Sequence, residues 1–205
     1  MTCITRGIVI KRGHSGDFDR QYVIYTRDLG KISAIAKGAK KVSSKLSPHL
    51  EIFSSVELML AKSAVFYRVA GARIDNSHRS IKSSLAKASV SLLFSEALDN
   101  LMINDFPDRK VFEISEDFFQ GIDCAKSMGE TLAKLNRGLF GLLSCSGYQP
   151  EIKSISQRQL ATELCRAVIN VTEKELKSYN FLHQLLKTAK PPLNKEVAKA
   201  CLNVY

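Results

Sequence analysis

Four lysines and no acidic residue lie within nine positions, Lys37 to Lys45, in the order Lys-Gly-Ala-Lys-Lys-Val-Ser-Ser-Lys. Apolar segments rich in β-branched residues flank this run at 32–36 and 52–60. A cationic loop with Gly and Ser between two strands can bind the phosphates of a polyanion. The alternative is a solvated loop whose lysines keep a strand edge from pairing with other chains.

The charge distribution favours the phosphate-binding interpretation. The 205 residues carry 30 Lys and Arg against 20 Asp and Glu, a formal net charge of +10. Residues 1–50 contain ten of the basic side chains and three of the acidic ones, so +7 of that charge lies in the first quarter of the chain. Such asymmetry indicates a surface for an anionic partner.

Aromatic residues are interspersed with the basic residues of this region. Small barrels bind single strands by stacking bases on exposed rings while cations contact the phosphates. Phe18, Tyr22 and Tyr25 are rings of this kind, and each either stacks on a base or fills the barrel core. Tyr25 alternates with Arg27 on one predicted strand face, so we expect Tyr25 to be the exposed ring.

Motifs of enzymatic chemistry are absent from the sequence. It contains no Walker loop, GxGxxG, HExxH or GxSxG motif, its four histidines are scattered, and its five cysteines form no CxxC pair. We therefore expect a protein that is not an enzyme and holds no metal. The odd cysteine count and the lack of a signal peptide predict a reducing cytoplasm. No apolar stretch is long enough to span a membrane.

The lysine run must be held by β-strands, which the first 74 residues predict at 4–11, 18–26, 31–36, 52–61 and 65–74. Asp28-Leu29-Gly30 is a predicted hairpin turn. Five short strands in about 70 residues are typical of a small closed barrel such as an OB-fold. An SH3-like barrel would give a similar pattern.

Helical periodicity begins near residue 82 and predicts an all-α second domain. Helices are expected at about 85–102, at 108–122 and from a capping box at Ser127 to a stop at Gly147. Capping boxes at Ser156 and Thr172 predict two more, the last of which buries Leu186 and ends at Pro191-Pro192. The fold class is therefore α+β, with a barrel over 1–76, a helical domain over 82–190 and a tail over 191–205.

Residues 28–41, Asp-Leu-Gly-Lys-Ile-Ser-Ala-Ile-Ala-Lys-Gly-Ala-Lys-Lys, resemble the N-terminal signature of the RecO family of bacterial recombination mediators. Leu50-Glu51-Ile52-Phe53 is similar to the family's return into the next strand. The helical part is similar through Arg137-x-x-Phe140-x-Leu142-Leu143 and Gly147-Tyr148-x-Pro150. The resemblance extends over most of residues 1–190.

This resemblance implies an N-terminal OB-fold that binds single- and double-stranded DNA and anneals complementary strands in DNA repair. It implies loading of RecA onto strands coated by single-stranded-DNA-binding protein (SSB), with RecR as partner, in the bacterial cytoplasm at the nucleoid. By position, the residues implied to contact DNA are Lys11, Arg12, Arg27, Lys31, Lys37, Lys40, Lys41 and Lys45.

The third helix would supply a groove for the acidic, apolar C-terminal tail of SSB. Arg137 matches the cation for the tail carboxylate, and the apolar residues that line this groove or pack in the core are Leu135, Leu139, Phe140 and Leu143. Ser146 stands where the family usually has leucine.

The chain departs from many family members in lacking a four-cysteine zinc site. The Gly-Tyr-x-Pro segment is followed by Glu151-Ile152-Lys153 and then by the helix start at Ser156, with no cysteine between. We therefore expect no zinc and no other cofactor.

Two other functions are compatible with the sequence. The helical domain of an adaptor protein would bind partner proteins while the basic barrel has little affinity for DNA. An RNA-binding barrel would prefer RNA to DNA because only RNA offers the 2′-hydroxyl.

Overall fold

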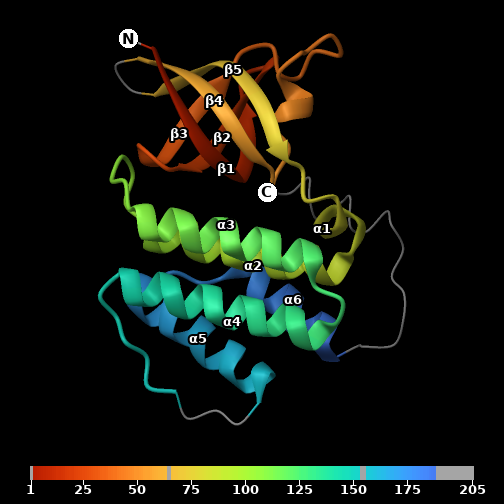
Figure 1. Ribbon diagram of the computed structural model, residues 1–205, viewed down its shortest axis with the longest axis vertical. Coiled ribbons are helices and arrows are strands. Elements are labelled where there is room, and N and C mark those ends of the chain that lie inside the picture. The colour runs from red at the N-terminus through yellow and green to blue at the C-terminus, as the bar shows by residue number, and fades with distance from the viewer. Residues whose placement is uncertain (1, 64–65, 153–155, 188–205) are drawn as a thin grey trace. The chain divides into compact units, whose positions relative to one another are not determined.

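The computed structural model describes residues 2–63, 66–152 and 156–187 (Figure 1). These residues form two compact units. The barrel unit contains the strands up to His78 together with Ile103–Phe112, and the helical unit contains Arg79–Met102 and the helices from Glu113 onward. The expected tail over 191–205 and the expected stop at Pro191-Pro192 lie outside the described residues.

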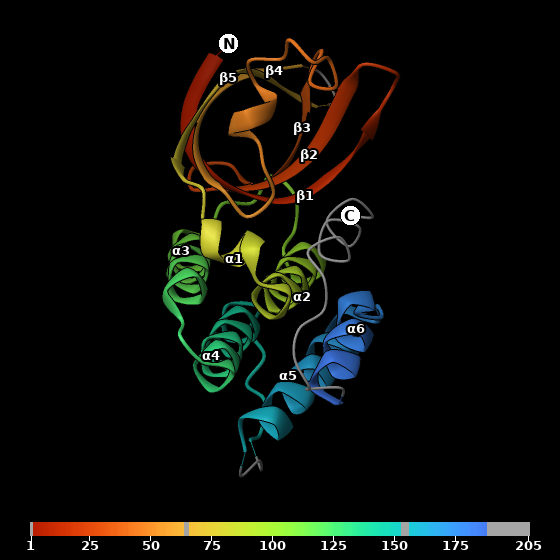
Figure 2. The ribbon, with the colours of Figure 1, turned by 90° about the vertical axis from the view of Figure 1, so that its right-hand side faces the viewer.

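Five strands form a closed barrel in the order β1-β2-β3-β5-β4, and the barrel closes through pairing of β1 with β4. The β3–β5 pair is parallel and the other pairs are antiparallel. This five-stranded arrangement is that of an OB-fold, which decides against the SH3-like alternative and confirms the predicted fold class. Figure 2 shows the strands as a closed ring. The strands are β1 (Thr2–Ser15), β2 (Asp19–Thr26), β3 (Gly30–Ala36), β4 (Ser55–Lys62) and β5 (Tyr67–Asn76).

Alternating apolar residues fill the barrel. Tyr22 and Ile24 of β2 point inward, as do alternate residues of the neighbouring strands, because successive side chains of a strand point to opposite faces. The inward set includes Ile32, Ala34, Val56, Leu58, Leu60 and Val69. A short 3₁₀ helix, η1 (Ser47–His49), follows the lysine run, and Leu50 after it is buried in the same core.

The helical unit packs its helices around aromatic residues. The Phe94 and Phe118 rings stack with centroids 3.8 Å apart, and Phe119 meets both rings edge-on. The helices are α1 (Arg79–Ser83), α2 (Leu85–Leu101), α3 (Arg109–Cys124), α4 (Met128–Cys145), α5 (Gln157–Thr172) and α6 (Lys177–Lys187).

Two predicted helix caps are confirmed and one is wrong. The Ser127 and Ser156 side chains accept hydrogen bonds from the amides of Glu130 and Gln159, as a capping box requires. Thr172 instead ends α5 and donates its hydroxyl to the Val168 carbonyl.

The start of α6 is capped by a residue distant in sequence. The Glu96 carboxylate of α2 accepts hydrogen bonds from the amides of Lys177 and Ser178, at 3.0 and 2.9 Å. A carboxylate is also favoured by the positive end of the helix dipole. The helix therefore begins five residues after Thr172, and the side chain of Leu186 near its end lies outside the described part of the chain.

Candidate nucleic-acid interface

The lysine run forms the loop between β3 and η1, and three hydrogen bonds tie this loop to the β1–β2 turn. The Gly38 amide donates to Asp19 Oδ1 (2.8 Å), and the Lys40 amide donates to the Phe18 carbonyl (2.9 Å). Lys40 Nζ also donates to the Gly16 carbonyl (2.6 Å). Gly38 has a φ of +66°, a conformation that costs glycine little. Backbone and side-chain contacts together fix the loop as part of the barrel.

The lysine side chains of this loop face solvent. Lys37, Lys41 and Lys45 are exposed and Lys40 is half-buried. We call these four lysines the cationic rim. Ion pairs elsewhere on the barrel join Arg6 to Asp75 and Arg73 to Glu57 and Asp75. Exposed ammonium groups on an anchored loop are available to phosphates.

Two arginines of the β1–β2 hairpin extend this positive region. Arg12 pairs in register with Tyr22, and Arg20 pairs with Ala36, the residue just before Lys37. Burial raises the pKa of the Tyr22 hydroxyl, and the nearby Arg20 and Arg12 guanidinium groups oppose that rise. The hairpin and the cationic rim therefore share one end of β2 and β3. Figure 2 shows β1 and β2 continuing past the ring of strands as this hairpin.

Arg27 and Lys31 do not belong to this region. They lie at the β2–β3 turn, where Thr26 pairs with Gly30, whereas the cationic rim begins where Arg20 pairs with Ala36. Six residues of strand separate the two ends, which corresponds to about 20 Å. Lys31 is also only 8% exposed, and its carbonyl accepts a hydrogen bond from the Asp105 amide (2.9 Å). The implied set of DNA contacts is therefore split, and Lys11 lies between its parts, opposite Val23.

The expectation that Tyr25 is an exposed stacking residue is wrong. Tyr25 is 0% exposed, and its hydroxyl donates to the Asp108 carbonyl (3.4 Å). Strand alternation does place Tyr25 outside the barrel core formed by Tyr22 and Ile24. The segment Ile103–Phe112, which belongs to the barrel unit, covers this outer face. Sequence alternation cannot reveal a cover supplied by residues about eighty positions away.

Phe18, rather than Tyr25, is an exposed ring of this region. The predicted strand began at residue 18, but β2 begins at Asp19 and leaves Phe18 in the turn. The Phe18 side chain is 61% exposed, and Lys41 Nζ lies 5.4 Å from its ring centroid. The glycine and aspartate at positions 16 and 17 were the signal that a turn still continued there.

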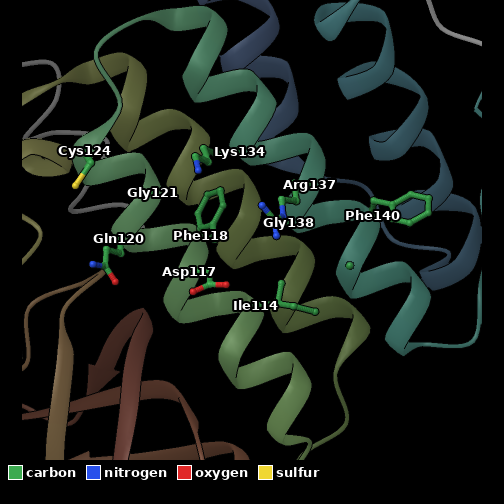
Figure 3. Close-up of a pocket in the computed structure, with 11 residues that line it drawn as sticks. Ile114, Asp117, Phe118, Gln120, Gly121, Cys124, Lys134, Arg137, Gly138 and Phe140 are labelled. Carbon is green, nitrogen blue, oxygen red and sulfur yellow. The ribbon is translucent and has the colours of Figure 1, made fainter.

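A groove of about 650 Å³ runs between α3 and α4 in the helical unit (Figure 3). Lys134 and Arg137 extend into its lining from α4, and Asp117 and Gln120 from α3. Phe140, 39% exposed, adds apolar surface. The full lining is Ile114, Asp117, Phe118, Gln120, Gly121, Cys124, Lys134, Arg137, Gly138, Phe140 and Gly141.

Of the five residues considered for tail binding, two line the groove and three take the core alternative. Arg137 and Phe140 line it, whereas Leu135, Leu139 and Leu143 are 0% exposed. The reason is the helical period, which places these leucines on the inward stripe of α4 and leaves Arg137 and Phe140 at the surface that borders the groove. The three leucines are core residues and do not reach a ligand.

Neither a metal cluster nor a membrane span is found in the part of the chain that the structure describes. In residues 2–63, 66–152 and 156–187, no group of three or more His, Cys, Asp and Glu side chains is placed to hold a metal ion. No described helix is long and apolar enough to cross a bilayer.

Comparison with known proteins agrees with this architecture. Residues 1–78, the barrel, match the family model described as "Recombination protein O N terminal". A protein named "DNA repair protein RecO" from Dehalococcoides mccartyi strain 195 is 31% identical over 163 residues, which cover 77% of this chain and 62% of the relative. The chain is similar to RecO proteins, and its barrel matches their N-terminal domain. The resemblance seen in the sequence is thus confirmed, and it extends beyond the barrel into the helical unit.

Other RecO proteins match over a similar range. The protein of the same name from Rubrobacter xylanophilus is 30% identical over 75% of this chain and 60% of its own length. The one from Nostoc punctiforme is 25% identical over 72% of this chain and 50% of its own length. The chain therefore spans one half to about three fifths of the curated RecO proteins that it matches.

Proposed function

We propose that this RecO-like protein is a non-enzymatic DNA-binding mediator of recombinational repair. The observation that carries the proposal is the cationic rim, in which Lys37, Lys41 and Lys45 are exposed on a loop tied to the β1–β2 turn. Lysines held on a rigid barrel neutralise phosphates and release condensed counterions, which gives salt-dependent binding to any strand.

Strand annealing follows from the same electrostatics. Two complementary strands repel each other through their phosphates, and cations that contact both strands lower this repulsion. The protein need supply no bond-making chemistry, because base pairing itself provides the driving force. The family's partners, RecR and the RecA filament, would act on the strand held in this way.

The experiment compares annealing of complementary oligonucleotides by the wild type and a Lys37→Glu/Lys45→Glu variant over a salt series. Lys40 is left intact because its Nζ holds the Gly16 carbonyl. Binding to single strands is measured over the same salt series. Loss of two phosphate contacts should flatten the slope of log Kobs, the observed binding constant, against log salt by roughly 1.4, at about 0.7 per contact.

A matched control separates the position of the charge from its amount. Lys126→Glu/Lys174→Glu makes the same change in net charge on exposed lysines of the helical unit. We expect this control to anneal nearly as well as the wild type. Equal loss in both variants, or a stronger effect on RNA than on DNA of the same sequence, would contradict the proposed site.

The α3–α4 groove supports a second part of the function, the binding of an acidic peptide such as the C-terminal tail of SSB. Lys134 and Arg137 offer two cations and Phe140 an apolar surface, while Asp117 opposes negative charge at one side. We expect Arg137→Ala to lower the affinity for a fluorescent tail peptide about tenfold or more, because hydrogen bonds between arginine and a terminal carboxylate are charge-assisted. Arg158→Ala, an exposed arginine of α5 that does not line the groove, is the control.

A further inference from the structure

An exposed aromatic ring and an exposed aliphatic tip lie at the cationic rim. Phe18 is 61% exposed in the β1–β2 turn, and Val42 is fully exposed within the lysine loop. The two tyrosines of the neighbouring strand β2, Tyr22 and Tyr25, are completely buried. Exposed apolar side chains next to lysines offer contacts to a ligand that has both apolar and anionic parts.

Three contacts hold Phe18 in place. Its carbonyl accepts the Lys40 amide, its neighbour Asp19 accepts the Gly38 amide, and Lys41 Nζ lies 5.4 Å from its ring centroid. An ammonium group at this distance is attracted by the negative face of the ring. The backbone that carries the ring is therefore held beside the cations, and more than half of the residue's surface stays open to solvent.

This pairing matches the two parts of a nucleotide. A base is a flat π-system that stacks on an aromatic ring, and its phosphate carries the charge that Lys41 would bind. The ring and Lys41 would contact the base and the phosphate of one nucleotide. In a duplex the bases are already stacked and paired, so only an unpaired base can reach the ring.

We propose that Phe18, oriented by Lys41, is the stacking platform for an unpaired base of single-stranded DNA. The inference rests on the proposed DNA-binding function and deepens it. The cationic rim then supplies affinity for any strand, and Phe18 supplies preference for single strands over duplex. A negatively charged membrane surface also attracts basic loops with apolar tips, but the two apolar side chains here offer little area for insertion.

The test measures binding of the full chain to three probes: a single-stranded oligonucleotide, the same backbone with every site abasic, and a duplex. Phe18→Ala should weaken binding to the normal single strand roughly fivefold to a hundredfold, the loss of one stacked base. It should leave the abasic strand and the duplex unchanged, because neither offers a free base. Phe18→Tyr should retain binding, since tyrosine keeps the π-face.

Phe106→Ala is the matched control. Phe106 is 69% exposed, belongs to the same unit and lies beside the β2–β3 turn rather than at the cationic rim. Its removal should leave all three affinities unchanged. Thermal unfolding of each variant confirms that it is folded.

The outcomes distinguish this inference from the proposed function. If the wild type binds single strands and Phe18→Ala binds them equally well, or loses as much affinity for the abasic strand, the stacking role is overturned while DNA binding stands. If the wild type binds no DNA, both proposals fail. Vesicles containing phosphatidylserine are a fourth probe, and a Phe18→Ala variant that loses affinity for these vesicles alone would overturn the inference in favour of a membrane contact.

Discussion

The backbone amide of Lys40 donates a 2.9 Å hydrogen bond to the carbonyl oxygen of Phe18. This bond joins the lysine loop after β3 to the turn before β2, and with the Gly38–Asp19 and Lys40–Gly16 bonds it holds the loop next to the residue that carries the exposed ring. Neither the lysine loop nor the turn could place the cations beside the ring without the other. The position of the cationic rim is thus a property of the barrel.

Asp19 provides a test of whether this anchoring matters for binding. Its carboxylate accepts the Gly38 amide at 2.8 Å, a hydrogen bond to a charged group worth about 1.5 kcal/mol or more. Asp19→Ala should lower stability by that amount and weaken single-stranded DNA binding, although it makes the protein more positive. Urea denaturation and fluorescence anisotropy measure the two effects.

Asp17→Ala is the control for charge in the same turn. Asp17 is exposed two residues away, and its removal adds the same positive charge without releasing the loop. We expect unchanged or slightly tighter DNA binding by this variant. Tighter binding by both variants would show that net charge, not loop position, determines affinity.

Gly30 lies at the β2–β3 turn, where the segment Ile103–Phe112 meets the barrel. Its φ is +69°, and a Cβ at this position would overlap the Phe106 carbonyl and approach the Pro107 nitrogen to 2.8 Å. Gly30→Ala should destabilise the barrel by several kcal/mol, because neighbouring backbone cannot yield as a side chain can. The Asp105 amide, which donates to the Lys31 carbonyl, should also exchange its hydrogen faster in this variant.

Gly16→Ala separates the clash from the backbone conformation. Gly16 has nearly the same φ, +63°, but a Cβ at this position would meet no atom within 4 Å. This variant should lose only about 1 kcal/mol, the cost of a left-handed conformation for alanine. Equal losses at Gly16 and Gly30 would mean that the 103–112 segment does not pack on the turn.

Local patterns predicted those parts of the fold that local physics decides. Strand alternation and the Gly30 turn indicated the barrel, and the Ser127 cap and Gly147, with φ +81°, indicated the ends of α4. Each of these signals acts over a few residues. The cationic rim was found for the same reason, because its four lysines are close together in sequence.

Errors occurred where distant segments meet. The cover on Tyr25 comes from Asp108, and the cap on Lys177 comes from Glu96, in each case about eighty residues away. The predicted start of the last helix at Thr172 failed because that side chain bonds within its own helix. A single sequence carries no local signal for such contacts.

Gly138 of α4 lies where the helix meets the aromatic core. A Cβ there would come within 2.7 Å of Phe94 Cε2 and 3.2 Å of Phe118 Cδ2. Alanine normally stabilises a helix interior by about 0.5–1 kcal/mol relative to glycine, but overpacking costs about 1–3 kcal/mol. Gly138→Ala should therefore destabilise, whereas Gly129→Ala, whose nearest neighbour is Ser127 Oγ at 3.9 Å, should not. An equal increase in the free energy of unfolding for both variants, measured by urea denaturation, would contradict the close packing of α4 on these rings.

Two cysteines allow the α3–α4 groove to be mapped by thiol labelling. Cys124 is exposed and lines the groove, whereas Cys165 is buried in α5 and burial raises its pKa to about 12. The thiolate is the reactive form, so Cys165 should stay unlabelled by iodoacetamide at pH 8 until the protein is unfolded. Because the folded state favours the neutral thiol, this contribution to stability is full below the unfolded thiol's pKa near 9 and is lost as the pH rises toward 12.

An acidic, apolar peptide bound in the groove should slow the labelling of Cys124 in proportion to occupancy, as measured by mass spectrometry of the labelled peptides. Cys165 serves as the internal reference for unfolding, since it reacts only if the helical unit opens. The protection should disappear in Arg137→Ala, because the peptide then loses a cation that lines the groove. Protection that persists in this variant, or that a peptide with its acidic residues replaced by lysine produces equally, would place the peptide elsewhere on the helical unit.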